Sequence, residues 1–166
     1  MRNEGGAHAA IVVAPEKRRV FPAMLFAKKK RRISNLLLVE DEPLVAFDTE
    51  HFLRDAEYSV VATVDRVADA LVVIGREREI DLVLVDISLA DGSGLDVARA
   101  AHGVGVPVLF VTGSCPEGGR EVAAGCLAKP YAQRDLLAAI AAIEAVLEGK
   151  KPKRMPNGFS LFVTVS

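Results

Sequence analysis

The sequence has few cysteines, no long apolar run and almost no net charge, and each of these absences narrows the class of protein. Its 166 residues include two cysteines, Cys115 and Cys126, whose spacing does not suit a metal site. A disulfide-stapled domain would carry more cysteines in a shorter chain, so we expect reduced thiols and a cytoplasmic location. No apolar stretch has the length of a bilayer span. Residues 9–14 are apolar, but charged residues follow at once, which makes them a poor secretory signal.

The net charge of −1 hides a strong segregation of charge along the chain. Residues 1–33 carry nine basic and two acidic side chains (+7), and residues 149–166 carry four basic and no acidic ones (+4), so the stretch between them has a charge of −12. We interpret this pattern as an acidic domain at 34–149 with a basic, flexible N-terminal extension at 1–33 and a short basic C-terminal tail at 150–166. With 51% hydrophobic residues, the chain can bury a sizeable core.

The basic run at residues 28–32 has two interpretations. A cluster of this kind can touch nucleic acid or another anionic surface. Here no aromatic residues are interleaved with it and no folded DNA-reading motif accompanies it. We therefore favour a solvated tail, or a gene start placed too far upstream with Met24 as the true beginning, and we expect no DNA-binding domain.

From residue 33 onward, short apolar runs alternate with amphipathic segments. The runs predict strands at residues 36–39, 58–64, 82–85, 107–111 and 125–129. Helical spacing predicts helices at residues 44–56, 66–78, 94–102, 117–124 and 133–148. The last of these helices should end at Gly149. This alternation predicts an α/β fold in which right-handed crossovers connect the strands of a parallel sheet.

Polar side chains follow or end four of the predicted strands. Glu40 and Asp41 follow the first strand, Asp86 follows the third, Thr112 ends the fourth and Lys129 ends the fifth. Ligands of open parallel sheets bind beyond the carboxyl ends of the strands. These five side chains are therefore expected to converge at one edge of the sheet.

Three carboxylates at one edge repel one another unless positive charge lies between them. Lys129 supplies one positive charge, and Mg²⁺, which prefers oxygen ligands, is the natural second. A carboxylate, a cation and a lysine suit phosphoryl transfer, because the carboxylate attacks while the two cations neutralise the transferred oxygens. Thr112 adds a hydroxyl that can hydrogen-bond a phosphoryl oxygen.

Taken one by one, these residues also have ordinary structural explanations. A lone Asp after a strand is most often a helix cap or a turn residue. Thr112 could be a turn residue, Lys129 could be surface charge, and residues 40–42 could merely favour the positive end of a helix dipole. The complementary set at four strand ends is what favours a site.

As an ordered set, the motifs resemble the receiver domain of two-component response regulators, across about residues 34–148. The motifs are Leu37-Leu38-Val39-Glu40-Asp41-Glu42-Pro43, Asp81-Leu82-Val83-Leu84-Val85-Asp86, Pro107-Val108-Leu109-Phe110-Val111-Thr112-Gly113 and Lys129-Pro130-Tyr131. The resemblance implies a flavodoxin-like, doubly wound sheet of five parallel strands in the order 2-1-3-4-5. It also implies that Asp86 is the phosphoacceptor. Asp41 would be a direct Mg²⁺ ligand, Glu40 a ligand through water, and the backbone carbonyl of Ser88 a further ligand.

The resemblance assigns the remaining residues to the phosphoryl group. Thr112 and Lys129 would bind its oxygens, and Pro130 would follow a cis peptide bond that aims the lysine. The donor would be a phosphohistidine on a histidine kinase or on a histidine phosphotransfer protein. The downstream partner cannot be named from the sequence.

Two departures from the family bear on how the signal leaves the domain. Many receivers have an aromatic residue where this chain has Cys126, and rotation of that aromatic side chain reports phosphorylation. Cys126 is a small apolar residue and cannot act in this way. The alternative role for Cys126 is that of a redox sensor.

The second departure is a short connection between the last two strands. Only sixteen residues lie between Thr112 and Lys129, so the fourth helix should be shortened to about two turns. A Phe-x-Thr-Gly sequence at 110–113 is similar to an alphaproteobacterial subset of receivers. We hypothesise that residues 113–125 are mobile and become ordered on phosphorylation.

Nothing beyond residue 149 resembles an effector domain. We therefore expect a single-domain receiver that signals by phosphorylation-dependent protein binding, or acts as a phosphate shuttle or sink. It would be no enzyme, apart from the autocatalytic phosphorylation and dephosphorylation of Asp86. The alternatives are a constitutive pseudo-receiver and a small phosphatase-like enzyme on the same fold. The latter class usually has an acid two residues after the nucleophile, where this chain has Ser88.

Overall fold

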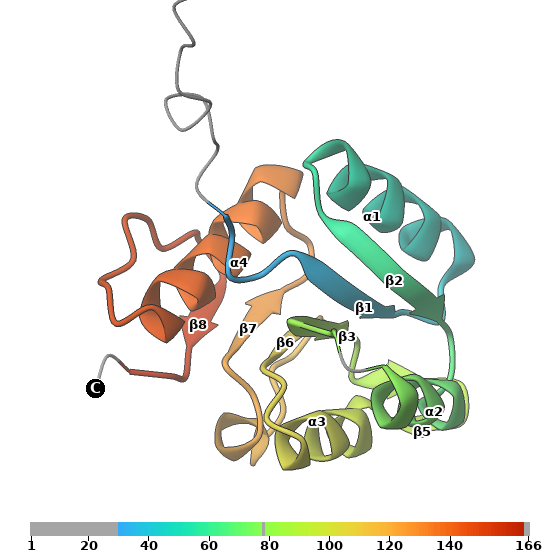
Figure 1. Ribbon diagram of the computed structural model, residues 1–166. Coiled ribbons are helices and arrows are strands. Elements are labelled where there is room, and N and C mark those ends of the chain that lie inside the picture. Colours follow the sequence, from blue (N-terminus) through green and yellow to red (C-terminus); the bar gives the residue numbers. More distant parts are fainter. Residues whose placement is uncertain (1–29, 78, 165–166) are drawn as a thin grey trace, which may run out of the picture. The chain divides into compact units, whose positions relative to one another are not determined.

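The computed structural model describes residues 30–77 and 79–164, and the compact unit begins at Arg31. A six-stranded sheet lies at its centre (Figure 1), with the strand order β2-β1-β3-β6-β7-β8. Its strands are β1 (Asn35–Val39), β2 (Ser59–Val64), β3 (Leu82–Val85), β6 (Val108–Thr112), β7 (Gly125–Ala128) and β8 (Phe159–Leu161). The first five strands are parallel and lie in the expected order, which confirms the flavodoxin-like fold. Strand β8 adds an antiparallel edge.

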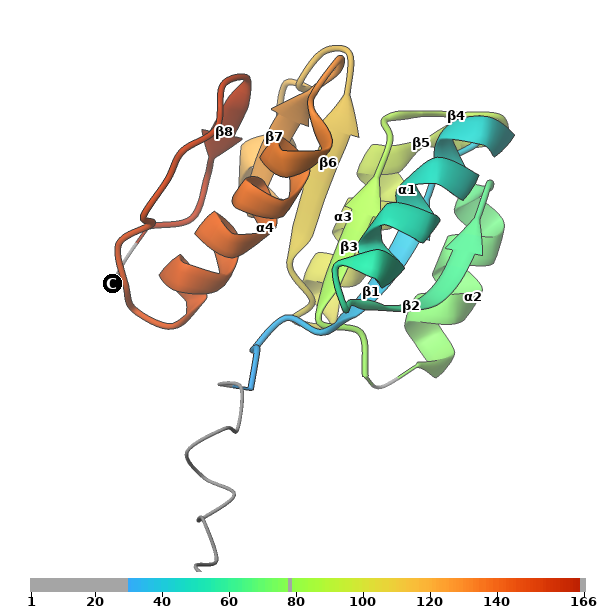
Figure 2. The ribbon, with the colours of Figure 1, turned by 90° about the horizontal axis from the view of Figure 1, so that it is seen from above.

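Helices cover both faces of the sheet (Figure 2). They are α1 (Pro43–Asp55), α2 (Val67–Arg76), α3 (Gly94–Gly103) and α4 (Gln133–Leu147). Helix α4 ends before Gly149, whose φ of 73° is the left-handed conformation that glycine favours at a helix end. Within the described residues, no helix is both long and apolar enough to cross a bilayer.

The core has two parts, one on each side of the sheet. Leu36, Leu38 and Leu84 belong to the part that α1 and α4 cover. Leu37 and other alternating residues of β1 and β3 belong to the part that α2 and α3 cover. Successive strand residues point to opposite faces, so a strand covered on both faces must be apolar throughout.

The connection between β6 and β7 differs from the two-turn helix predicted for it. It contains a single 3₁₀ turn, η2 (Gly119–Glu121), preceded by Gly118 with a φ of 77°. Parallel pairing places Phe110 of β6 beside Cys126 of β7, and the loop after β6 brings Cys115 to the same place. Residues 113–118 form the loop that brings Cys115 back to β7, so the rest of the connection has room for little more than one turn.

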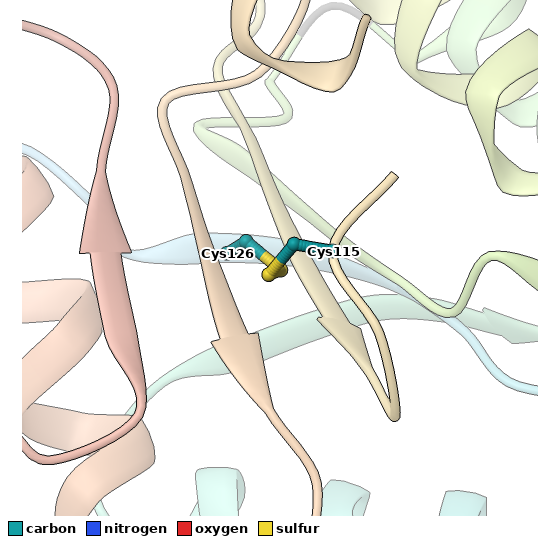
Figure 3. Close-up of a disulfide and its surroundings, with 2 residues drawn as sticks. All are labelled: Cys115 and Cys126. Carbon is teal, nitrogen blue, oxygen red and sulfur yellow. A yellow bond between two sulfur atoms is a disulfide. The ribbon is translucent and has the colours of Figure 1, made fainter. Parts of the chain in front are cut away.

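The expectation of reduced thiols is wrong, because Cys115 and Cys126 form a disulfide with their Cα atoms 6.1 Å apart (Figure 3). The expectation rested on the number of cysteines in the chain. The bond instead depends on a loop that folds back along its own strand, which residue counts do not reveal. Cys126 is therefore neither a free thiol nor a simple apolar filler.

Both ends of the described chain are packed on the domain. Ile33 is buried, and the Arg31 guanidinium donates to the Ala56 carbonyl and lies 4.6 Å from the centre of the Tyr58 ring. The ordered unit therefore starts a little before residue 34. In the C-terminal tail, β8 pairs with β7 through residues 159–161. The expected flexibility of the N-terminal extension concerns mainly residues 1–29, which lie outside the described residues.

Candidate functional site

The carboxyl ends of β1, β3, β6 and β7 form the edge at which the candidate residues meet. Backbone hydrogen bonds continue the sheet into these residues. The Glu40 N–H donates to Val64 at 3.0 Å and the Asp86 N–H to Val39 at 3.1 Å. The Lys129 N–H donates to the Thr112 carbonyl at 2.8 Å. Neighbouring strands therefore fix the backbone of three predicted site residues.

Three acidic side chains come together at this edge, as the sequence predicted. Glu40, Asp41 and Asp86 each offer a carboxylate oxygen, and these oxygens lie within 4.8 Å of one another. Glu40 and Asp86 are buried, with 5% and 9% of their surface exposed, and Asp41 is half-buried. Buried carboxylates this close need compensating positive charge.

Lys129 supplies positive charge to two of the three acids. Its Nζ atom donates to Asp86 Oδ2 at 2.8 Å and to Glu40 Oε2 at 2.9 Å. Burial alone would lower the pKa of Lys129, but hydrogen bonds and attraction from the two carboxylates outweigh it and raise the pKa above its usual value. The lysine is therefore charged at neutral pH. The peptide bond between Lys129 and Pro130 is cis, as the resemblance to receiver domains implied.

The second oxygen of each paired acid is held by a backbone N–H two residues further along the chain. Asp86 Oδ1 accepts from the Ser88 N–H at 3.2 Å, and Glu40 Oε1 accepts from the Glu42 N–H at 3.0 Å. Each of these two carboxylates is thus held on one side by Lys129 and on the other by the backbone of the residues that follow it. Ser88 therefore lies at the site and contacts Asp86 through its N–H, while the metal-binding role of its backbone carbonyl stays a prediction.

Thr112 lies at the same edge as the last residue of β6, and it is buried with 4% of its surface exposed. In the described contacts it reaches the lysine through its backbone carbonyl. Among the described residues, the Thr112 hydroxyl makes no hydrogen bond to Glu40, Asp41 or Asp86. The structure therefore places Thr112 beside the site and leaves its contact with a phosphoryl group as a prediction.

Two residues of the turn that follows Asp86 have structural roles and were not singled out as site residues from the sequence. A Cβ atom added to Gly94 would lie 2.0 Å from the backbone oxygen of Asp86, so only glycine fits there. Asp91 accepts from the Val67 and Ala68 N–H groups at 2.7 and 3.1 Å and so caps the start of α2. Both belong to the Gly-rich turn at residues 91–94, which was a visible signal. That turn forms the hairpin of β4 (Ser88–Leu89) and β5 (Gly92–Ser93).

A groove of about 440 Å³ lies beside this edge, between α1 and the start of α4, and Lys129 is part of its lining. Glu42 and Asp48 give it negative charge, and Phe52, Tyr131 and Leu136 line it with apolar surface. The acid cluster beside this groove offers oxygen ligands for a hard cation. It also places a carboxylate that could accept a transferred group next to the ammonium group of Lys129.

Comparison with known proteins agrees with this arrangement. A family model of the response regulator receiver domain matches residues 36–141. The phyllosphere-induced regulator PhyR of Methylorubrum extorquens is 34% identical over 113 residues, which are 64% of this chain and 42% of that protein. The cell cycle transcriptional regulator CtrA of Caulobacter vibrioides is 31% identical over 81 residues, which are 48% of this chain and 34% of that protein. The chain thus spans less than half the length of these two curated relatives.

Solved receiver structures share the fold. A CheY-like response regulator receiver domain protein from Methanospirillum hungatei JF-1 gives a TM-score of 0.60 at 27% identity, covering 65% of this chain and 90% of that chain. The PhyR response regulator REC domain of Erythrobacter litoralis gives a TM-score of 0.59 at 29% identity, covering 67% and 89%. The family match spans more than half of the sequence and includes all four strand ends of the candidate site. The chain belongs to the response regulator receiver domain family.

Proposed function

We propose that this domain accepts a phosphoryl group from a phosphohistidine onto Asp86. The donor would be a histidine kinase or a histidine phosphotransfer protein. The observation that carries the proposal is the position of Lys129 Nζ, 2.8 Å from Asp86 Oδ2 and 2.9 Å from Glu40 Oε2. The ammonium group is already at the acceptor carboxylate, where the charge of incoming phosphoryl oxygens must be neutralised.

The acid cluster fits a bound Mg²⁺ ion. Three carboxylates with one ammonium leave an excess of negative charge, and hard oxygen donors suit this cation. In the proposed site, Asp41 and Asp86 would hold the ion directly, Glu40 would hold it through water, and the Ser88 carbonyl would be a further ligand. The bound ion would supply charge neutralisation at the phosphoryl oxygens.

The proposed reaction is a direct displacement at phosphorus. A carboxylate oxygen of Asp86 forms the new P–O bond while the P–N bond of the phosphohistidine breaks, and the electron pair of that bond stays on the imidazole nitrogen. Lys129 and Thr112 donate hydrogen bonds to the phosphoryl oxygens. The domain acts only on its own Asp86, so we do not class it as an enzyme. We keep a cytoplasmic location as part of the proposal, and it no longer rests on the expectation of reduced thiols.

The output that we propose is phosphorylation-dependent binding of another protein, with a role as phosphate shuttle or sink as the alternative. Residues 113–125 would be the responding segment, since they connect the two phosphoryl-binding residues Thr112 and Lys129. Amide exchange in this segment should slow when a phosphoryl mimic is bound. Equal exchange with and without the mimic would contradict an order–disorder switch.

Labelling with a phosphorylated donor tests the proposed function. The protein is incubated with a phosphohistidine protein and Mg²⁺, beside the variants Asp86→Asn and Asp96→Asn. Asp96 is the matched control, because it is an exposed carboxylate on α3 that pairs with Arg99 and does not belong to the acid cluster. We expect label on the wild type and on Asp96→Asn, and none on Asp86→Asn.

Two other outcomes would each support a different function. Absence of label on the wild type would indicate a constitutive interaction module. Rapid turnover of a small phosphoester would instead indicate a phosphatase-like enzyme.

A further inference from the structure

We propose that the Cys115–Cys126 disulfide is a reversible latch on the loop that follows β6. We call residues 113–118 the latch loop. In the oxidised protein the bond fastens this loop to β7, and a dithiol reductant releases it. The chemistry at Asp86 enters only as a second readout, so this inference can succeed or fail independently of the proposed phosphoryl transfer.

The position of the disulfide ties it to the candidate site. Cys115 comes three residues after Thr112, and Cys126 comes three residues before Lys129. Thr112 ends β6 and Lys129 directly follows the adjacent strand β7, and the two residues are joined by a backbone hydrogen bond of 2.8 Å. The cross-link therefore spans the connection between these two residues, and Figure 3 shows it reaching from the loop onto β7.

Apart from this bond, the latch loop buries little of itself. Residues 113–115, 117 and 118 are exposed. Its contact with the turn that follows is made by Pro116, whose carbonyl accepts from the N–H of buried Gly119 at 3.2 Å. A segment with few buried contacts has low local stability, so loss of the covalent bond should raise the frequency at which it opens.

The two cysteine residues differ in their exposure, and this difference favours reversible exchange. Cys115 is exposed, whereas Cys126 is completely buried among apolar side chains on the α2 and α3 side of the sheet. A thiolate from solvent therefore has access at the Cys115 end. Exposed disulfides are typically the labile, regulatory ones, and the sizeable core of this domain does not depend on a staple.

The exchange has a balanced course with a dithiol as reductant. A thiolate of the reductant forms a mixed disulfide with Cys115, and the electron pair of the broken S–S bond goes to Cys126, which takes up a proton. The second thiolate of the reductant then displaces Cys115, which is protonated in turn. The protein gains two electrons and two protons, and the reductant leaves as a disulfide.

Reduction should free the loop and leave the strand in place. Reduced Cys126 remains a small apolar side chain in its buried position in β7, where it pairs with Phe110 on one side and Ser160 on the other. Cys115 has no comparable burial to hold it. Movement should therefore be confined to the latch loop, which makes the loop next to Thr112 responsive to the thiol redox state.

Amide hydrogen exchange on the full chain tests the latch. Oxidised protein is compared with protein reduced by dithiothreitol, and thiol counting verifies the state of each sample. We expect exchange in the latch loop to rise about tenfold or more on reduction, with α4 unchanged as the internal reference. The Cys115→Ser variant should show the faster rate with and without dithiothreitol. Because Cys115 is exposed, this substitution should not disturb the core.

The outcomes separate the latch from the proposed function. Equal exchange of the loop in oxidised and reduced wild type would overturn the latch, as would two free thiols in protein purified without reductant. In parallel, the rate of Asp86 labelling is measured for both forms. Absence of label in both contradicts the proposed phosphoryl transfer, whereas the exchange data still decide on the latch.

Discussion

The environment of Asp86 depends on two single residues, Lys129 for charge and Gly94 for space. Among the described residues, Lys129 is the cation that reaches both Glu40 and Asp86, and it does so with 22% of its side chain exposed. Gly94 is equally specific on the steric side, because the Asp86 carbonyl occupies the space of a side chain there. The Lys129 contact thus constrains the side chain of Asp86, and the close approach of Gly94 constrains its backbone.

Replacing Gly94 tests the steric constraint. Gly94→Ala should destabilise the domain by about 1–3 kcal/mol, because the new methyl group must displace the backbone at Asp86. The control is Gly103→Ala, since a Cβ at Gly103 meets nothing within 4 Å at the end of α3. That control should leave stability unchanged or slightly raised. Urea unfolding measures both variants, and equal midpoints would contradict the constraint.

At the scale of elements, the α2 helix receives its N-terminal cap from a distant hairpin. The Asp91 carboxylate, between β4 and β5, accepts the first N–H groups of α2 from Val67 and Ala68. These hydrogen bonds lower the pKa of Asp91. A lowered pKa means that the carboxylate stabilises the fold above its ordinary pKa and that this contribution is lost as the pH falls.

The cap therefore predicts a pH-dependent effect of Asp91→Ala. At neutral pH the variant should have a lower melting temperature than the wild type, because α2 loses its cap. The difference should shrink as the pH falls below the ordinary pKa of 3.8, where the wild-type carboxylate becomes protonated. Thermal unfolding followed by circular dichroism measures this. Asp96→Ala is the control, and a gap between Asp91→Ala and wild type that stays constant with pH would contradict the cap.

The elements also show how far the sequence could predict the structure. The strands at 36–39 and 82–85 were predictable because burial on both faces demands an uninterrupted apolar run. The meeting of Glu40, Asp86 and Lys129 followed from parallel topology. The Asp91 cap, the Cys115–Cys126 bond and the pairing of β8 were not predictable, because each joins segments whose proximity exists only in the folded chain.

For the whole domain, the excess negative charge at the acid cluster links ion binding to folding. Glu40, Asp41 and Asp86 converge in the folded chain and separate when it unfolds, so a cation bound among them stabilises the folded state. A free cation concentration ten times the dissociation constant would raise the free energy of unfolding by about 1.4 kcal/mol. This gain would be a property of the whole domain and not of one residue.

Magnesium titration tests this linkage in the proposed site. The melting temperature of the wild type should rise with added Mg²⁺ and fall back after chelation. Asp41→Asn should lose most of this response, and it should leave intact the lysine contacts, which involve Glu40 and Asp86. A melting temperature of the wild type that is insensitive to Mg²⁺ would contradict the site.

Strand β8 has a consequence for solubility. Without it, β7 would be the edge of the sheet and would present unpaired backbone groups, which invite pairing with other chains. Phe159 fits closely over Gly125, where a Cβ would lie 2.7 Å from its ring, and so seals that edge. A chain shortened to end at Gly149 should therefore associate in a concentration-dependent manner that light scattering detects, while the full chain stays dispersed. By pairing with β7, strand β8 therefore protects the domain from aggregation through that edge.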